Sequence, residues 1–209
     1  TSWNERTSGI SKSIYGVTYG NGTFVTVGDN GTILTSSDGT SWNERTSGIS
    51  KSIYGVTYGN GTFVAVGGEL LVNGTILTSS DGISWTSRTS GTSNLLYRIT
   101  YGNSTFVTVG WEGTLLTSSD GISWDNRTSG TSNLLSGVTY GNGLFVVVGR
   151  YGTILTSSDG ISWTSRTSGT SKSLYGVTYG NGTFVTVGYS ITSSSTSTSD
   201  NSTPTITTE

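Results

Sequence analysis

Five arginines recur at one place in a repeated motif, W-x-x-R-T-S-G, and they are the side chains best suited to bind an anion. A guanidinium group can hold sulfate, phosphate or an acidic sugar through paired hydrogen bonds. The alternative is that each arginine pairs with a nearby carboxylate or a turn carbonyl. We expect the segment that carries them to be the outermost strand of its sheet, away from any central channel. The residues are Arg6, Arg45, Arg88, Arg127 and Arg166.

Five tyrosines recur in the same way, each at the end of an expected strand and beside a turn. An aromatic face in a shallow pocket could stack on a sugar ring, which would be a lectin-like use. The alternative is packing against the next copy of the repeat. The residues are Tyr19, Tyr58, Tyr101, Tyr140 and Tyr179.

An S-S-D-G turn follows the third expected strand in four copies. Its carboxylate can accept backbone N–H groups of its own turn, and the glycine after it can take a positive φ. We therefore expect these aspartates to hold the turn together rather than to bind a cation. They are Asp38, Asp81, Asp120 and Asp159.

Eight Asn-x-Ser/Thr sequons are candidate sites of N-glycosylation. Turn chemistry explains many of the same asparagines, because Asn-Gly favours two-residue hairpin turns. The candidates are Asn21, Asn30, Asn60, Asn73, Asn103, Asn126, Asn181 and Asn201.

One turn of the repeat varies while most of the motif stays constant. Variation confined to one rim is typical of a binding face, although loops also tolerate change. The first copy has Asp29 and Asn30 there, and later copies have Trp111 and Glu112, or Arg150 and Tyr151.

The composition argues against enzymatic activity, metal sites and cofactors. The chain has no His and no Cys, so it lacks the side chain that most often acts as a general base and the common zinc ligands. With charged residues at 11% and a net charge of -2, it has no basic surface for nucleic acid. No apolar run is long enough to insert into a membrane. We expect a non-enzymatic protein.

The whole chain is one short unit used five times, beginning at Trp3, Trp42, Trp85, Trp124 and Trp163. Copies recur about every 40 residues, which is typical of propellers and related arrays. An insertion at 68–72 lengthens one copy, and we expect it to form a surface loop.

The sequence pattern of each copy predicts four antiparallel strands. In the copy that begins at Trp124, the strand-like segments are 134–140, 144–148, 153–156 and 163–166. The third is apolar on both faces, as a strand covered by sheets on both sides must be. We predict an all-β, five-bladed β-propeller with four antiparallel strands per blade.

The motif S-S-D-G-x-S-W resembles the Asp-box turn of sialidase-like (BNR-like) propellers. With V-G-x-x-G-T-I-L before it, the repeat is also similar to those of photosystem II assembly-factor propellers and of many secreted bacterial proteins. The resemblance covers about residues 1–188 and implies a propeller fold in which this turn joins the third and fourth strands. It implies little about function, because such propellers have many roles.

We expect one propeller domain at 1–192 and a Ser/Thr-rich tail or linker at 193–209. Residues 1–8 form a fourth strand without the preceding three, so we expect them to pair with the last blade and close the ring. After Gly188 the expected G-T-I-L-T is missing. The last blade is therefore either loose, with 189–192 as a worn third strand, or completed by a neighbouring molecule.

From these features we expect an extracellular or cell-surface protein with a structural or adhesive role, such as a subunit of a glycosylated fibre or layer. Its partners would be other copies of itself, other surface proteins, or glycans. The alternative is a multivalent carbohydrate-binding propeller with equivalent pockets between blades, since many identical weak sites give avidity.

Overall fold

The structure of the chain is a computed structural model that describes residues 2–70, 72–189 and 205–208. It contains five antiparallel sheets, each formed by consecutive strands. The first sheet contains β1 (Ile14–Gly20), β2 (Thr23–Gly28), β3 (Ile33–Ser36) and β4 (Asn43–Arg45). The second contains β5 (Ile53–Gly59), β6 (Thr62–Glu69), β7 (Asn73–Ser79) and β8 (Thr86–Thr89). The third contains β9 (Leu96–Gly102), β10 (Thr105–Gly110), β11 (Leu115–Ser118) and β12 (Asp125–Asn126).

The fourth sheet contains β13 (Leu135–Gly141), β14 (Leu144–Gly149), β15 (Ile154–Ser157) and β16 (Thr164–Arg166). The fifth has three strands, β17 (Ser173–Gly180), β18 (Thr183–Tyr189) and β19 (Thr205–Thr208). The predicted all-β fold with four antiparallel strands per repeat is confirmed for the first four sheets.

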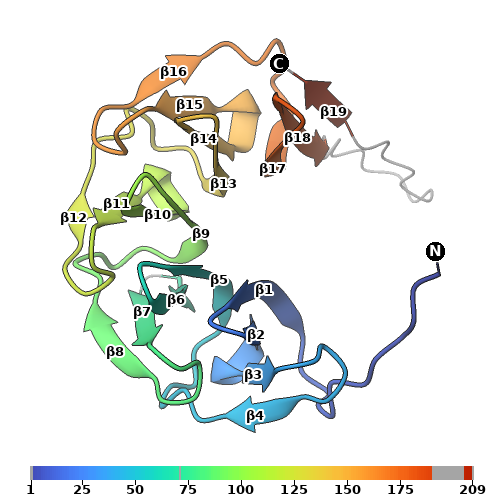
Figure 1. The fold of residues 1–209 in the computed structure, drawn as a ribbon. Helices are drawn as coiled ribbons and strands as arrows, with labels where there is room; N and C mark the ends of the chain where they lie inside the picture. The colour runs from blue at the N-terminus through green and yellow to red at the C-terminus, as the bar shows by residue number, and fades with distance from the viewer. Residues whose placement is uncertain (1, 71, 190–204, 209) are drawn as a thin grey trace, which may run out of the picture.

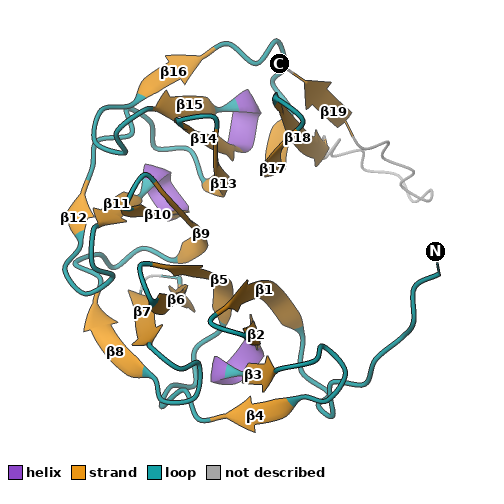
Figure 2. Ribbon diagram, in the orientation of Figure 1, coloured by secondary structure: helices purple, strands orange, loops and turns teal. Residues whose placement is uncertain are grey.

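The sheets stand side by side around an axis, as the blades of a propeller do (Figure 1). The first strand of each sheet lies nearest the axis, and the fourth strand lies at the periphery (Figure 1). Strands and loops make up almost the whole molecule (Figure 2). The only helical elements in the described residues are short 3-10 turns, η1 (Asp29–Gly31), η2 (Trp111–Gly113) and η3 (Arg150–Gly152). No helix in this part of the chain has the length and apolar character needed to cross a membrane.

The core lies between neighbouring sheets rather than inside any one of them. The first cluster joins Val25, Val27 and Ile33 of the first sheet to Ile53 and Phe63 of the second. Three similar clusters follow around the ring. Alternation explains the pattern, because successive residues of a strand face opposite neighbours and both neighbours are sheets.

The insertion at 68–72 extends a hairpin instead of forming a separate loop. It lengthens β6 and β7, which remain paired as far as Glu69 opposite Asn73. Leu70 and Val72, at the tip, are exposed.

The predicted closure of the ring is not observed. The amino-terminal segment forms no strand before Ile14, the side chain of Trp3 is fully exposed, and this segment lies apart from the last sheet (Figure 1). The physical reason lies in the last copy. In the complete sheets the fourth strand pairs with a third strand of the type Thr-Ile-Leu-Thr or Thr-Leu-Leu-Thr, and the sequence directly after β18 is not of this type.

The third position of the last sheet is taken by β19, within the segment that the sequence assigns to a tail. It pairs antiparallel with β18, placing Val187 opposite Ile206 and Val185 opposite Thr208. Of the predicted worn strand at 189–192, Tyr189 ends β18, and residues 190–192 lie outside the described residues.

Candidate functional site

The four S-S-D-G turns have one geometry. In the second sheet, Asp81 Oδ1 accepts the backbone N–H groups of Ile83 and Ser84 at 2.8 and 2.9 Å, and the Ser79 hydroxyl at 2.9 Å. The N–H of Ser84 contributes most to lowering the pKa of the Asp81 carboxyl, followed by that of Ile83. The same contacts and the same direction of shift occur at Asp38, Asp120 and Asp159. Each carboxylate is thus occupied by its own turn.

The tryptophan that follows each turn covers it. The indole Nε1 of Trp85 donates to the carbonyl of Gly82 at 2.9 Å, and its ring lies 6.4 Å from that of Phe63. Trp124 and Trp163 make equivalent bonds.

The outer-strand arginines bind threonine hydroxyls of the neighbouring third strand. The Nε of Arg88 donates to Thr78 Oγ1 at 2.8 Å, and Arg45, Arg127 and Arg166 repeat this contact. Arg127 also pairs with Asp125 at 2.8 Å. Arg6 is exposed on the amino-terminal segment. The arginines therefore lie around the periphery and do not converge on one anion site.

The recurring tyrosines lie over glycines of the preceding sheet. A Cβ placed on Gly20 would be 2.1 Å from Cγ of Tyr58. Tyr101, Tyr140 and Tyr179 cover Gly59, Gly102 and Gly141 in the same way. Each ring also packs on a phenylalanine of its own sheet, at 4.6 Å for Tyr58 and Phe63. No described sheet packs in front of Tyr19, which is 57% exposed. The other four rings pack between two sheets as expected, but the sheet they cover is the preceding one and not the next.

Five asparagines of the hairpin turns between the first and second strands have positive φ, between 45 and 49°. Asn142 shares this conformation without being part of a sequon, so the turn alone accounts for asparagine there. Asn30, Asn73 and Asn126 are exposed elsewhere on the surface, and Asn201 lies outside the described residues. The remaining turn asparagines are Asn21, Asn60, Asn103 and Asn181.

A second set of tyrosines, which the sequence analysis did not single out, forms a continuous strip along the inner strands. The ring centroids of Tyr15 and Tyr54 are 5.1 Å apart, and those of Tyr54 and Tyr97 are 5.5 Å apart. We call these three residues the tyrosine strip. Each occupies the second position of the motif [IL]-Y-[GR]-[VI]-T-Y, where the strand has a register shift opposite its partner. The bulge turns each ring toward the corresponding ring of the next sheet.

One end of the strip is acidic. The Tyr15 hydroxyl donates to Asp29 Oδ1 at 2.9 Å, and so does Ser52 Oγ. The bond from Tyr15 contributes most to holding the pKa of Asp29 below its usual value, and the same bond raises the pKa of Tyr15. Asp29 lies in η1, the turn whose sequence varies between copies.

The other end of the strip is basic. Arg98 follows Tyr97 on β9, and its Nη1 donates to the carbonyls of Tyr54 and Tyr97 at 2.6 and 3.0 Å. Among the described residues, Nε and Nη2 of Arg98 donate no hydrogen bond to the protein. Partial burial lowers the pKa of Arg98, but a guanidinium stays charged at neutral pH. The Arg150 guanidinium stacks 5.5 Å from the Trp111 ring and acts electrostatically on Tyr97.

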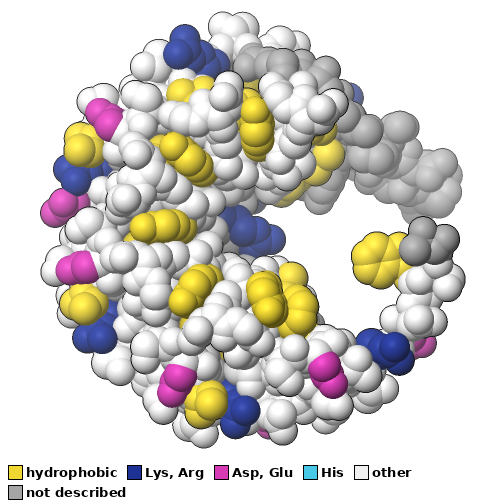
Figure 3. Space-filling model, viewed as in Figure 1, with side chains coloured by type: hydrophobic (Ala, Val, Ile, Leu, Met, Phe, Trp, Pro, Cys, Tyr) yellow, Lys and Arg dark blue, Asp and Glu magenta, His cyan; other side chains and the backbone are white. Residues whose placement is uncertain are grey.

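Arg98 is the only charged residue on the five inner strands, whose sequences are otherwise almost identical. The equivalent residues are Gly16, Gly55, Gly137 and Gly176. The molecule is hollowed at its centre, and a basic side chain lies at the edge of the hollow (Figure 3). The break in the repeat at Tyr97-Arg98-Ile99 was the sequence signal that could have identified this residue.

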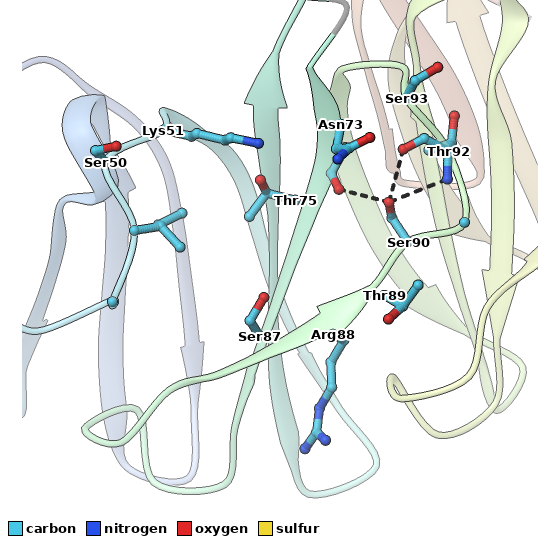
Figure 4. A pocket seen from close by; sticks show the side chains of 14 residues that line it. Ser50, Lys51, Asn73, Thr75, Ser87, Arg88, Thr89, Ser90, Thr92 and Ser93 are labelled. Carbon is cyan, nitrogen blue, oxygen red and sulfur yellow. Dashed lines mark hydrogen bonds between the residues drawn. The ribbon is translucent and has the colours of Figure 1, made fainter.

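Polar grooves recur at the periphery. One of about 720 Å³ lies between the 48–51 loop, β7, β8 and the loop after β8 (Figure 4). Ser90 fixes its wall by donating to the carbonyls of Gly74 and Thr92 (Figure 4). Grooves of about 660 and 460 Å³ occupy equivalent places beside Arg45 and Arg127. Their linings are mostly Gly, Ser and Thr. Three of the predicted arginines therefore border grooves of one type.

Across the part of the chain that the structure describes, no three acidic, His or Cys side chains gather where they could hold a metal ion. Charged groups in contact with the strip or acting on it include Asp29, Arg98 and Arg150. Hydrogen bonding, charge pairing and aromatic stacking are the interactions that they can offer to a ligand.

No protein-family model matches the sequence, and no curated protein matches it either. Among solved structures, the chain is similar to YCF48 bound to a D1 peptide, with a TM-score of 0.67 and 19% identity over 85% of this chain and 61% of that one. YCF48 from Cyanidioschyzon merolae has a TM-score of 0.64 and 14% identity, over 93% of this chain and 72% of that one. A chain of a nidogen/laminin complex has a TM-score of 0.63 and 12% identity, over 87% of this chain and 77% of that one.

This chain spans 61% of the length of the first of these structures. At such low identity the likeness concerns the fold alone, and it supports the β-propeller architecture. The more specific resemblance to Asp-box propellers stays a prediction.

Proposed function

We propose that this chain is a non-enzymatic binding scaffold that takes an extended peptide segment of a partner protein across the tyrosine strip. The observation that carries this proposal is Arg98, the single charged side chain of the inner strands. It lies beside Tyr54 and Tyr97 with Nε and Nη2 directed to no protein acceptor among the described residues. Two parallel N–H groups of a guanidinium match the two oxygens of a carboxylate.

The strip suits a peptide better than a small reactive substrate. Adjacent tyrosine rings provide apolar faces and polar hydroxyl groups, and tyrosine is enriched where proteins bind one another. With Asp29 at one end and Arg98 at the other, the strip favours a segment whose own charges have the opposite order. An acidic residue or a terminal carboxylate would lie at Arg98, and a basic residue near Asp29.

Two of the similar structures support this class of ligand. One is a YCF48 chain bound to a D1 peptide, and another belongs to a nidogen/laminin complex. Both contain a propeller of this kind together with a peptide or protein partner. They support protein binding as a class and say nothing about the identity of a partner here.

Selection from a random peptide display library with the full chain tests the proposal. We expect enriched peptides to combine an aromatic or apolar stretch with an acidic residue, and binding of the synthesised peptides to weaken about tenfold or more in Arg98→Gly. Glycine occupies this position in the other four copies, so the variant retains a residue that the strand already accepts. Tyr54→Ala should also weaken the binding of these peptides.

Arg6→Ala is the matched control, because it removes one positive charge from a segment remote from the strip (Figure 1). Its binding should equal that of the unchanged chain. The proposal fails if no peptide is enriched, or if the enriched peptides bind Arg98→Gly as well as they bind the unchanged chain.

Binding of glycans in the peripheral grooves is a second candidate function. It is favoured by the recurrence of one groove type beside Arg45, Arg88 and Arg127, with hydroxyl-rich walls suited to sugar hydroxyls. Weak equivalent sites would act together through avidity. A glycan array probed with the full chain distinguishes this function, because glycan binding would persist in Arg98→Gly and fall in Arg88→Ala.

We also retain as proposals the extracellular or cell-surface setting and a structural or adhesive role with glycosylated sequons. They are supported by the repetition and by the exposure of the sequon asparagines that the structure describes. The incomplete last copy favours contact between molecules. The intact mass of the protein from its natural source tests glycosylation, since an unmodified chain has a mass of 21.8 kDa.

A further inference from the structure

The five sheets form an open arc (Figure 1). Neighbouring sheets pack against each other through two complementary surfaces, and one of these surfaces is left uncovered at each end of the arc. Inside the chain this contact occurs four times, and it always includes residues of the second and third strands of one sheet and of the first strand of the next. Among the described residues, no sheet packs in front of the first sheet or behind the last one. Each end therefore exposes what the interior sheets bury.

At the amino-terminal end, the exposed half is the face of β1. Val17 is 64% exposed, whereas its equivalents Val56 and Ile99 are each 8% exposed. Ile14 is 38% exposed, whereas Ile53 is fully buried. The ring of Tyr19 covers no glycine of a preceding sheet.

At the carboxy-terminal end, the exposed half is the face of β18 and the glycine that ends β17. Val187 is 43% exposed, whereas its equivalents Val27 and Val148 are fully buried. Among the described residues, Gly180 is the only glycine of its type at which an added Cβ would meet nothing within 4 Å. It is the counterpart of Gly20, which Tyr58 covers.

The last sheet also lacks a fourth strand, and the first residues of the chain have the sequence of one. Asn4-Glu5-Arg6 repeats Asn43-Glu44-Arg45, the whole of β4. In the first sheet, Ile33 pairs with Arg45 and Thr35 with Asn43. The strand β19 holds the place of β3, with Ile206 opposite Val187 as Ile33 is opposite Val27. No described strand pairs with its outer edge.

We propose that a second copy of this chain docks head to tail on the last sheet. Tyr19 of the incoming copy covers Gly180, and the exposed apolar faces of β1 and β18 meet. The incoming residues 4–6 pair with β19 as its fourth strand, with Arg6 opposite Ile206. After two copies have joined, the pair still has one uncovered β1 face and one uncovered β18 face. The contact is therefore heterologous and can repeat.

The arc leaves a gap narrower than itself (Figure 1). Copies joined in this way cannot all lie in one plane, so they form an open-ended helical assembly rather than a closed ring. Pairing of the exposed strand edge adds main-chain hydrogen bonds to the apolar contact. The inference gives a surface and a register to the self-association proposed above, and it is independent of peptide binding.

Sedimentation of the full chain over a range of concentrations tests it. The unchanged chain should increase in mass beyond a dimer as its concentration rises. Gly180→Ala should remove this dependence, because a Cβ at the equivalent glycines would lie 2.1 to 2.2 Å from the tyrosine ring. The same methyl group meets nothing within 4 Å in the single chain, so folding should be unaffected.

A further variant with two controls tests the strand pairing of residues 4–6. Glu5→Pro should weaken association because proline cannot donate in a strand ladder, while Glu5→Ala should not. Ile122→Ala, at an exposed apolar residue away from both ends, should associate like the unchanged chain. A monomer at every concentration overturns the proposal, and so does association that persists unchanged in Gly180→Ala. Either result leaves the peptide-binding proposal standing.

Discussion

The ring of Tyr58 lies directly on the backbone of Gly20 in the preceding sheet, at a distance that leaves no room for a side chain. The pair explains why an aromatic residue and a glycine recur together in each copy. The glycine lets the two sheets approach, and the tyrosine fills the space between them.

Gly59→Ala should destabilise the protein. The added Cβ would lie 2.1 Å from Cγ of Tyr101, so the ring or the sheet must shift. Overpacking of this kind costs about 1–3 kcal/mol. Chemical denaturation monitored by tryptophan fluorescence measures the change. Gly180→Ala is the internal control, and an equal loss in both variants would contradict the explanation.

Acid should destabilise the protein through the four S-S-D-G turns. Backbone N–H bonds lower the pKa of each carboxyl in the folded state below its ordinary value of 3.8. The folded state then binds fewer protons, so this stabilisation is complete above the unfolded pKa and is lost as the pH falls through the folded pKa. Thermal unfolding from pH 6 down to acid measures it, and Asp81→Asn should reduce the acid dependence. Glu5→Gln should leave it unchanged.

Thr78→Val should cost about 0.5–1.5 kcal/mol, because Arg88 Nε loses its acceptor while the volume of the side chain stays nearly constant. A double-mutant cycle with Arg88→Ala isolates the contact. If the two single changes add without coupling, the 2.8 Å bond between these residues contributes nothing to stability.

Tyr15 should ionise at higher pH than an ordinary tyrosine, since its hydroxyl donates to Asp29 and loss of that proton places two negative charges together. NMR titration of the tyrosine Cζ resonances measures this. Asp29→Asn should return the pKa of Tyr15 toward 10.0. Tyr15 should titrate normally if the bond is absent in solution.

The sheets could be predicted because their signals are local. The third strand of the fourth sheet was expected at 153–156 and is observed at Ile154–Ser157. Apolar alternation and turn residues such as Asn142 and Gly143 determine these elements without reference to distant parts of the chain.

The ends and the strip could not be predicted in the same way. Closure depends on whether residues 1–8 find a partner strand, which is a question of tertiary arrangement. The strand β19 does carry a signal, because Thr205-Ile206-Thr207-Thr208 resembles Thr32-Ile33-Leu34-Thr35, but the sequence between it and β18 lacks the motif of the repeat. The tyrosine strip depends on a bulge in each inner strand, and the motif alone does not show where a bulge directs a ring.

Near-identical sheets around an axis would let a ligand at the centre bind in several equivalent rotational positions. Arg98 on β9 removes this equivalence, because it occurs on one sheet only. A ligand that binds at the centre through Arg98 therefore has a single rotational orientation, in which its other end points toward the sheet that carries Asp29.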